Sequence, residues 1–584
     1  MSLFDDASLV LIPDGAKDGK LYSVKPTDGT GDFTFARGSN LAATRVDENG
    51  LIEKGRENLL LQSNQFDTTW VNANSTNTSG QSGYDGSSDA WLLSKTGANG
   101  RITQTKSISS IFTFSVYVKK GTTDWVLLYK TGTGEGGRYF DLTNGVIGSS
   151  VATAPIDSNI EDVGNGWYRC SIIGNSATAV VIYVADSNGS VSGTSGNIYI
   201  QDAQLEQGLV ATDYIETGAT TAQAGILEDL PRIDYSGGAS CPALLLEPQR
   251  TNFEAHSEYL DAAAVKDNVV ITSNATTSLE GVDNASNLVD NATSGLHRFY
   301  SIPSTTAASG VTMTHSIFAK ANGHSWFQLS SGGQTNDQWA NFDLTNGVIG
   351  NSSASANADI QPMGNGWYRC VINSTTSASS ALVATIPTLT NDTDASTRSP
   401  VYSGSGNGVF LYGLQCEEGS YPTSYIPTYG SSVTRSVDGL SISDIQTNNL
   451  IGSNQGSFVF HYKTYNAYTG NAGEIYDFRI DSNNRMATYF SNGTLRLFSN
   501  IAGVTNFNQA TTLDGDTEFK IGVAYDTNST LVYINGALSY TLNSFDLGVT
   551  NFDIAPPADG LKIGDFSWFP TKLTATELAA ITTI

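Results

Sequence analysis

Asp202 and Glu206 are acidic residues whose spacing could serve catalysis. A glycoside hydrolase needs two carboxyl groups about 5–10 Å apart, and residues four apart on a strand face the same side. The segment that contains them occurs twice in the chain, and the matched residues in the second copy are Gly413 and Glu417. Because the second copy lacks one carboxylate, the pair does not favour a hydrolase common to both copies.

Histidine, the most frequent general base, is also missing from the first copy. The five histidines are His256, His297, His315, His324 and His461. The sequence contains no HExxH, GxSxG or Walker pattern. We therefore predict that the protein is not an enzyme, and a glycan depolymerase remains the alternative.

Tryptophan side chains indicate a different chemistry, because exposed aromatic rings can stack on the faces of sugars. Four tryptophans match between the two copies, and a shared fold needs a shared core, so we expect these to be buried: Trp125, Trp326, Trp167 and Trp367. The unshared Trp70, Trp91 and Trp339 are the candidate sugar-binding residues. Core packing is the alternative role for these three.

An internal duplication relates the two copies. Phe140 to Gly148 recurs identically at Phe342 to Gly350, and Gly164 to Cys170 recurs identically at Gly364 to Cys370. Weaker matches flank both pairs in the same order. Such repetition indicates two homologous structural units.

The local sequence pattern is that of β-structure. The even positions from Phe112 to Lys119 are apolar and the odd positions mostly polar, which predicts a half-buried antiparallel strand. Asn144-Gly145 and Asn346-Gly347 lie between apolar runs and favour tight hairpins. Thr574 to Glu577 is a capping box that predicts one short helix. We predict an all-β protein of tandem β-sandwich or jelly-roll domains.

The sequence predicts five parts. They are an N-terminal assembly or anchoring segment (1–55), jelly-roll module 1 (56–218), a linker (219–249), the homologous module 2 (250–428) and a C-terminal β-domain (429–584). The N-terminal segment is too short for a large core of its own. We expect it to pack on a neighbouring part or to mediate assembly.

The chain is strongly acidic, with a net charge of −26 and only 30 basic residues. This charge repels nucleic acid and anionic lipid, and no run of Lys or Arg makes a local exception. No apolar stretch approaches the roughly 18 residues that a membrane helix needs, and the acidic N-terminus does not look like a Sec signal. We predict no nucleic-acid partner and no membrane insertion.

Several motifs resemble known proteins. Leu21 to Gly29, Phe33 to Gly38 and Asn49 to Glu53 are similar to the opening of many tailed-bacteriophage structural proteins. The paired Gly-Asn-Gly-Trp-Tyr-Arg-Cys motifs resemble carbohydrate-binding-like jelly-roll modules repeated in such proteins. Val532 to Gly536 and Leu561 to Gly564 resemble the laminin-G or concanavalin-like lectin fold.

The resemblance implies a virion component, as a fibre, tail or capsid-decoration protein exposed on the particle surface. Its expected partners are other virion proteins and the glycans of a host surface or the environment, bound weakly and multivalently by a dimer or trimer. A bacterial surface adhesin is a further alternative. Related modules often hold a structural calcium ion through an acidic residue on the last strand, and Asp202 matches that position. The alternative for Asp202 is a solvated residue at a strand end, and Gly413 puts the site in doubt for module 2.

Overall fold

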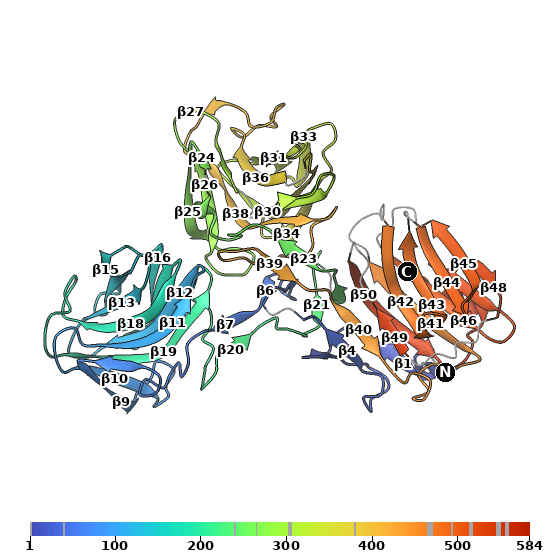
Figure 1. Cartoon of the computed structure of the whole chain (residues 1–584), viewed down its shortest axis with the longest axis horizontal. Helices are drawn as coiled ribbons and strands as arrows, with labels where there is room; N and C mark the ends of the chain where they lie inside the picture. Colours follow the sequence, from blue (N-terminus) through green and yellow to red (C-terminus); the bar gives the residue numbers. More distant parts are fainter. Residues whose placement is uncertain are drawn as a thin grey trace.

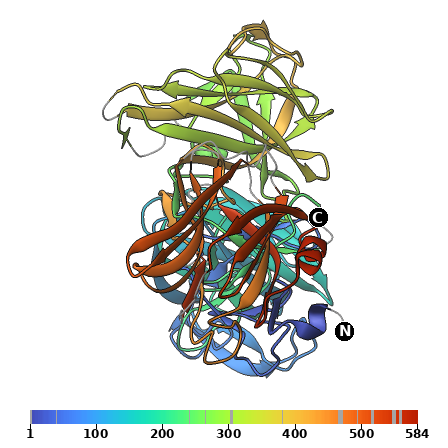
Figure 2. The same ribbon diagram turned by 90° about the vertical axis from the view of Figure 1, so that its right-hand side faces the viewer.

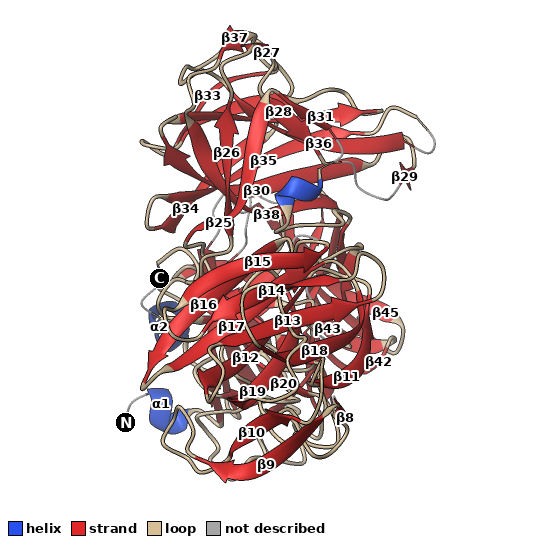
Figure 3. Cartoon of the chain, turned by 90° about the vertical axis from the view of Figure 1, so that its left-hand side faces the viewer, coloured by secondary structure: helices blue, strands red, loops and turns tan. Residues whose placement is uncertain are grey.

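The fold is known from a computed structural model. It describes residues 3–38, 41–238, 241–263, 265–301, 306–378, 381–463, 471–491, 494–512, 518–544, 551–554 and 560–584. Three β-sandwiches surround a central meeting point of short strands, with module 1 at the left of Figure 1, module 2 at the top and the C-terminal sandwich at the right. Strands dominate throughout (Figure 3), which confirms the all-β prediction.

Module 1 is a sandwich of two six-stranded antiparallel sheets. The inner sheet, which faces the centre of the molecule, has the order β16-β17-β12-β19-β10-β9, and the outer sheet has the order β15-β14-β13-β18-β11-β8. The bounds are β8 (Val71–Ala73), β9 (Ser75–Gln81), β10 (Ala90–Lys95), β11 (Arg101–Ile108), β12 (Phe112–Lys120), β13 (Trp125–Thr131), β14 (Gly136–Asp141), β15 (Val146–Ala152), β16 (Asp157–Gly164), β17 (Trp167–Gly174), β18 (Ala177–Ala185) and β19 (Asn197–Gln207).

Strand β12 departs from the predicted half-buried pattern. Phe112, Phe114 and the later even positions fill the core, but Thr113 and Ser115 on the opposite face are buried as well. The reason is that this face of the inner sheet packs on the centre of the molecule, where the Thr113 hydroxyl donates to the Gly208 carbonyl. The polar side chains of this face therefore form their hydrogen bonds inside the protein and not with water.

Module 2 repeats the same architecture. Its sheets have the orders β25-β26-β38-β30-β35-β34 and β24-β28-β36-β31-β32-β33, with β29 beside β36. The bounds are β24 (Val265–Asp267), β25 (Val269–Thr276), β26 (Ala285–Asp290), β28 (Arg298–Tyr300), β29 (Thr306–Ala307), β30 (Thr312–Asn322), β31 (Trp326–Gly333), β32 (Trp339–Asp343), β33 (Val348–Ser352), β34 (Ala358–Gly364), β35 (Trp367–Thr375), β36 (Ala381–Leu389) and β38 (Gly408–Glu418). Strands β27 (Ser294–Gly295) and β37 (Tyr402–Ser403) form a small ribbon, and η1 (Leu260–Ala262) is a short 3-10 turn.

The C-terminal sandwich is assembled from distant parts of the chain. One sheet has the order β21-β22-β50-β41-β46-β47-β48 with β1 also on β50, and the other has the order β2-β3-β4-β40-β49-β42-β43-β44-β45. The bounds are β1 (Leu9–Leu11), β2 (Ala16–Lys17), β3 (Lys20–Leu21), β4 (Phe33–Ala36), β21 (Arg232–Asp234), β22 (Ala243–Leu246), β40 (Gly439–Ile442), β41 (Gly456–Lys463), β42 (Asn471–Asp481), β43 (Asn484–Ser491), β44 (Thr494–Ile501), β45 (Val504–Thr512), β46 (Glu518–Tyr525), β47 (Thr530–Ile534), β48 (Ala537–Leu542), β49 (Asn551–Ile554) and β50 (Leu561–Phe569).

Two predicted boundaries therefore change. The segment 1–55 is not a separate unit, because Leu9, Leu11 and Phe33 are fully buried in the C-terminal core. The stretch 219–249 is not a free linker, because Leu244 to Leu246 pair with β50. Apolar residues in both stretches complete a core that residues 429–584 do not close alone.

A buried ionic cluster joins these parts at the centre. Arg232 pairs with Glu247 at 2.7 Å and with Asp438, Arg435 pairs with Glu247 at 2.9 Å, and Arg37 lies 3.4 Å from Asp438. All five side chains are fully buried. Two flanking pairs of strands complete the centre, β7 (Arg56–Asn58) with β20 (Ala222–Ala224) and β23 (Arg250–Asn252) with β39 (Val433–Arg435).

Helices are short in the part of the chain that the structure describes. Helix α2 (Ala575–Ile581) begins at the predicted capping box, in which the Thr574 side chain and Glu577 bond reciprocally. Figure 2 shows α2 and α1 (Leu3–Asp6) beside the C-terminal sandwich, where both chain ends lie. No helix among the described residues has the length and apolar character needed to cross a membrane.

Candidate functional site

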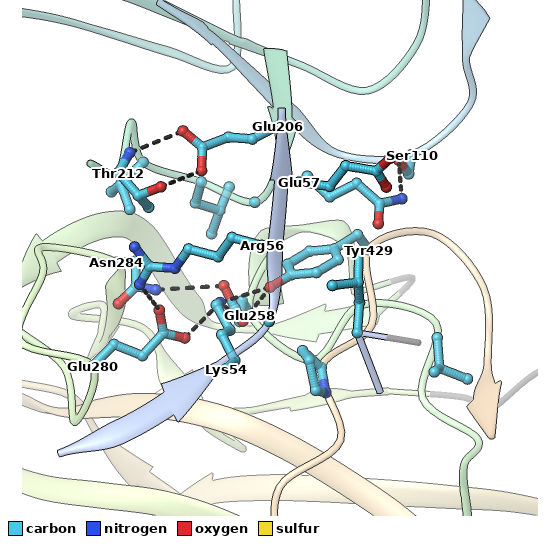
Figure 4. A pocket seen from close by; sticks show the side chains of 18 of the residues that line it. Lys54, Arg56, Glu57, Ser110, Glu206, Thr212, Glu258, Glu280, Asn284 and Tyr429 are labelled. Atoms are coloured by element: carbon cyan, nitrogen blue, oxygen red, sulfur yellow. Dashed lines mark hydrogen bonds and ion pairs between the residues drawn. The ribbon is translucent and has the colours of Figure 1, made fainter. Parts of the chain in front are cut away.

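A group of buried charge pairs lies at the joint between the two modules (Figure 4). Lys54 ends β6 (Ile52–Lys54), which forms a hairpin with β5 (Thr44–Val46) just before module 1. Its ammonium lies 2.8 Å from Glu258 and 2.5 Å from Glu280, both of module 2, and donates to the Tyr429 hydroxyl at 2.6 Å. A cavity of about 140 Å³ adjoins this group, with Asn284 in its wall.

Two cations face two carboxylates at the joint, because Arg56 also lies 3.4 Å from Glu280. Burial opposes the charged form of Lys54, but Glu258 and Glu280 outweigh it and raise the pKa of Lys54 above its ordinary value. The Tyr429 and Tyr425 hydroxyls donate to the same Glu258 oxygen at 3.0 and 3.2 Å. A buried ammonium held by two carboxylates is a fixed structural contact, so we interpret this site as the part that sets how module 1 sits on module 2.

The outer sheet of module 1 presents a different kind of surface, which faces away from the other domains (Figure 3). Trp125 and Tyr129 of β13 and Tyr183 of β18 are partly exposed there, above the buried Leu127 and Tyr139. The Tyr129 and Tyr183 rings meet edge to face with centroids 6.1 Å apart. These part-exposed rings form an aromatic platform, on which the apolar face of a sugar ring can stack.

Charged groups border this platform. The Arg101 guanidinium lies 5.4 Å from the centre of the Tyr183 ring, on its face. Burial, and then the Glu135 carboxylate, raise the pKa of Tyr129. The platform therefore combines aromatic rings with hydrogen-bonding groups, as the recognition of a polyhydroxyl ligand requires.

The matched face of module 2 has polar residues at the same positions. Tyr129 lies four residues after Trp125 on its strand, and Ser330 lies four residues after the matched Trp326, so the two positions correspond. Tyr183 lies opposite Leu127, and Thr388 lies opposite Gln328, the counterpart of Leu127. Thr388 is therefore the counterpart of Tyr183. The two tyrosines of the platform are thus specific to module 1.

Module 2 covers its own face with a loop. The connection from β36 to β38 spans 390–407, and Gln328 donates to the Thr397 carbonyl at 3.1 Å while Asn341 donates to the Ala395 carbonyl at 2.7 Å. In module 1 the connection from β18 to β19 is shorter, spanning 186–196; it brings Val191 against the aromatic cluster, and its Asn188 side chain accepts from the Ser149 amide and hydroxyl, each at 2.8 Å. A loop therefore lies over this face in both modules, and the shorter loop of module 1 leaves Trp125, Tyr129 and Tyr183 partly exposed.

The predicted surface tryptophans Trp70 and Trp91 are core residues. They are 5% and 6% exposed, and both rings contact Phe66. Each indole donates inward, Trp70 to the Gln62 carbonyl at 3.1 Å and Trp91 to the Asn64 carbonyl at 2.9 Å. Their lack of counterparts in module 2 reflects a different packing of the core and not a ligand surface.

Trp339 lies where a ligand could reach it. It is partly exposed on β32 and pairs across the sheet with Ser330, on the outer face of module 2. Among the matched tryptophans, Trp167 and Trp367 are buried as predicted, at 1% and 2% exposure. The prediction was wrong for Trp125 and Trp326, which are partly exposed on the outer faces.

Asp202 occupies a bulge of β19. Its φ of 51° lies in the left-handed region, as does the φ of 63° at Gly413 in module 2, so the two positions share a backbone shape. The Tyr84 hydroxyl donates to its carboxylate at 3.0 Å, and burial raises the pKa of Asp202 to about 7. A buried carboxyl that accepts from a phenol is poorly suited to calcium, which prefers several charged or carbonyl oxygens. These contacts give Asp202 a structural role and do not support the calcium site.

The other predicted acidic position is also structural. Glu206 accepts from the Thr212 amide at 2.9 Å and from the Thr212 hydroxyl, and Glu417 accepts from Thr423 in the same way. Both glutamates thereby pin the turn after the last strand of their module. In the described part of the chain, no group of three or more His, Cys, Asp or Glu residues is placed to hold a metal ion.

The platform tyrosines were not among the predicted site residues. The prediction considered tryptophans alone, and strand alternation does not tell which face of a sheet meets solvent. A position-by-position comparison of the two copies would have found them, because Tyr183 and Tyr129 stand where module 2 has Thr388 and Ser330.

No known protein family and no curated protein matches the sequence. Among solved structures, the binding domain of botulinum neurotoxin DC in complex with rat synaptotagmin II is similar at 13% identity and a TM-score of 0.23, over 25% of this chain and 40% of that chain. A structure of botulinum neurotoxin type C, described as entering cells through two ganglioside molecules, matches at 14% identity and a TM-score of 0.22, over 25% of this chain and 39% of that chain.

The Ruminococcus gnavus IT-sialidase CBM40 bound to alpha2,3 sialyllactose matches at 19% identity and a TM-score of 0.20, over 24% of this chain and 86% of that chain. The matches thus span about two fifths of the neurotoxin chains and about a quarter of this one.

Proposed function

We propose that the protein is a virion component that attaches weakly and multivalently to glycans of a host surface or the environment. In this proposal the platform of Trp125, Tyr129 and Tyr183 is a sugar-binding surface. The observation that carries it is the partial exposure of Tyr129 and Tyr183 at positions where module 2 has the buried Ser330 and Thr388. In module 2, Trp339 is the corresponding candidate.

Each platform is expected to bind weakly. A flat surface offers one or two stacked rings and a few hydrogen bonds, which corresponds to a Kd of about 1 mM, or roughly −4 kcal/mol. Repetition of the sites in a homo-oligomer and over a particle raises avidity by about 10²–10⁴ without any new contact. Weak sites are therefore compatible with firm attachment.

A glycan array probed with the intact oligomer tests the sugar-binding part. We expect signal on a subset of host-derived glycans, and loss of that signal when Tyr129 and Tyr183 are both replaced by alanine. Tyr22→Ala is the matched control, because Tyr22 is an exposed tyrosine of the N-terminal segment, 38% exposed. Signal on uncharged glycans that survives the double replacement would contradict the sugar-binding role of this platform.

The virion assignment is supported by the resemblance of the N-terminal motifs and by an acidic composition in which only 15% of the residues are charged. Mass spectrometry of purified particles should detect the chain in stoichiometric amounts. Its absence from particles, together with its presence on the surface of uninfected bacteria, would favour the adhesin alternative.

We further propose that the chain has no hydrolytic activity. The support is that Glu206, the kept carboxylate of the candidate pair, is occupied by Thr212. Release of reducing ends from capsule or cell-wall glycans, abolished by Glu206→Gln in a protein that remains folded, would favour the depolymerase alternative.

A further inference from the structure

A second candidate ligand surface lies on the C-terminal sandwich, on the outward face of strands β42 to β45. Cross-strand pairing places Tyr489 opposite Arg496, Ala487 opposite Phe498 and Arg485 opposite Asn500. The residues between them along each strand, such as Met486 and Leu497, point into the core and are buried. Tyr489, Arg496, Phe498 and Asn500 are therefore neighbours on the solvent side.

The two rings of this face, Tyr489 and Phe498, are partly exposed and lie close to one small residue, Ala487. Tyr489 and Phe498 meet edge to face with centroids 6.3 Å apart, and Ala487 is fully buried beneath the longer side chains around it. The neighbouring side chains cover this small residue, so the two part-exposed rings form the apolar surface of the face. An apolar ring face can rest there.

The charge of this face is unusual for so acidic a chain. Arg479 lies 2.6 Å from Asp553, and Arg485 lies 3.1 Å from Asp477, so both are neutralised within the sheet. Arg496 has no carboxylate within ion-pair distance among the described residues, and its guanidinium donates only to the Asn508 side chain, at 3.4 Å. The face therefore keeps one uncompensated guanidinium beside the two rings.

One polar atom of the face also lacks a partner. The side-chain oxygen of Asn500 is shielded from solvent and accepts no hydrogen bond from any residue that the structure describes. A buried acceptor of this kind is normally satisfied by water or by a ligand donor. A sugar hydroxyl would supply the missing hydrogen bond once the Asn500 side chain turns its oxygen toward the ligand.

We propose that this face binds glycans that carry carboxylate sugars. The pyranose ring rests on Phe498 and Tyr489, the carboxylate accepts two parallel hydrogen bonds from Arg496, and a hydroxyl donates to Asn500. Arg496 suits this role because a guanidinium presents a planar pair of donors that matches a carboxylate. The inference extends the proposed glycan-binding function to a separate site, and the two sites can fail independently.

The test uses the full-length protein and two matched polymers, polygalacturonate and its fully methyl-esterified form, which lacks the charge. We expect polygalacturonate to bind at least about tenfold more tightly than the ester, a difference of about 1.4 kcal/mol, and to be weakened by added salt. Arg496→Gln should abolish the difference, and Phe498→Ala should weaken both polymers. Arg479→Gln is the control on the same face and should leave the preference in place.

Equal binding of the two polymers by the native protein, or an unchanged preference in Arg496→Gln, would overturn the inference. The variant with Tyr129 and Tyr183 replaced by alanine separates the two sites. Preference for polygalacturonate that persists in that variant supports the C-terminal site, whatever the outcome for the platform of module 1. Preference that is lost in that variant but kept in Arg496→Gln would assign the carboxylate to module 1 and contradict this inference.

Discussion

Replacement of Phe33 by alanine should destabilise a domain that lies more than 400 residues further along the chain. Phe33 belongs to β4 and is fully buried. Its ring meets Phe566 edge to face at 5.2 Å, Trp568 at 6.1 Å and Phe552 at 6.2 Å. Removing a buried phenylalanine from such a site costs about 3–5 kcal/mol, as lost apolar burial plus the cavity that remains.

That loss is a large part of the roughly 5–15 kcal/mol by which a domain is stable. Hydrogen exchange followed by mass spectrometry reports each sandwich separately, which matters because a chain of several domains does not unfold in one step. In Phe33→Ala we expect faster exchange in β41, β46 and β50, with modules 1 and 2 unchanged.

Phe4→Ala is the matched control, because Phe4 lies in the same segment and is 52% exposed. Its effect should stay within about 0.5 kcal/mol. Exchange in β41 and β50 that is equally slow in Phe33→Ala and in the native protein would refute the shared core of the N-terminal segment and the C-terminal sandwich.

Three further predictions concern buried polar groups and the β19 bulge. Burial raises the pKa of Glu254 to about 7, so this group binds more protons in the folded than in the unfolded state between about pH 4.5 and about pH 7, and its contribution to the stability of module 2 falls as pH rises through that window. Burial lowers the pKa of His315 in the same module to about 4, which acts in the opposite direction; thermal melts should therefore show the Glu254 contribution as the difference in slope between the native protein and Glu254→Gln, and parallel profiles would contradict it. Arg232→Met removes one cation partner from two buried carboxylates and should lower the free energy of unfolding, measured in urea, by about 3–5 kcal/mol. Lys120→Met, in an exposed ion pair, should lower it by less than about 1 kcal/mol. Equal effects would contradict the structural role of the central ionic cluster. Gly413→Asp, which imitates module 1, should lower the melting temperature of module 2, because a Cβ there would lie 2.7 Å from the Phe318 ring; an unchanged melting temperature would show that the ring can move away.

Local pattern was enough to predict the strands, the duplication and the C-terminal helix. Alternation in β12 and the capping box at Thr574 are set by residues a few positions apart. The partners of Leu9 to Leu11 and of Leu244 to Leu246 are not local, because both pair with β50 near the end of the chain. Short apolar runs show that a strand is buried but not against which strand, so the assembly of the C-terminal sandwich could not be predicted from them.

The candidate sites depended on which face of a sheet meets solvent. The Trp91 ring is buried against Phe66, which is distant in sequence. Nothing in the sequence around Trp91 distinguishes it from an exposed ring. Arg496 and Phe498 were missed because their significance depends on cross-strand neighbours. The sequence does contain one signal, which is the difference between its two copies. A position that is polar in one copy and aromatic in the other indicates that the two modules have different surfaces.

The most direct test of the proposed attachment function is the affinity of the intact protein for the strongest glycan found on the array, measured by calorimetry. We expect the native protein to bind with a Kd of about 1 mM per site, and the variant with Tyr129 and Tyr183 replaced by alanine to bind at least about tenfold more weakly while its hydrogen exchange stays native. An affinity unchanged by the double replacement would show that the platform of module 1 does not bind sugar.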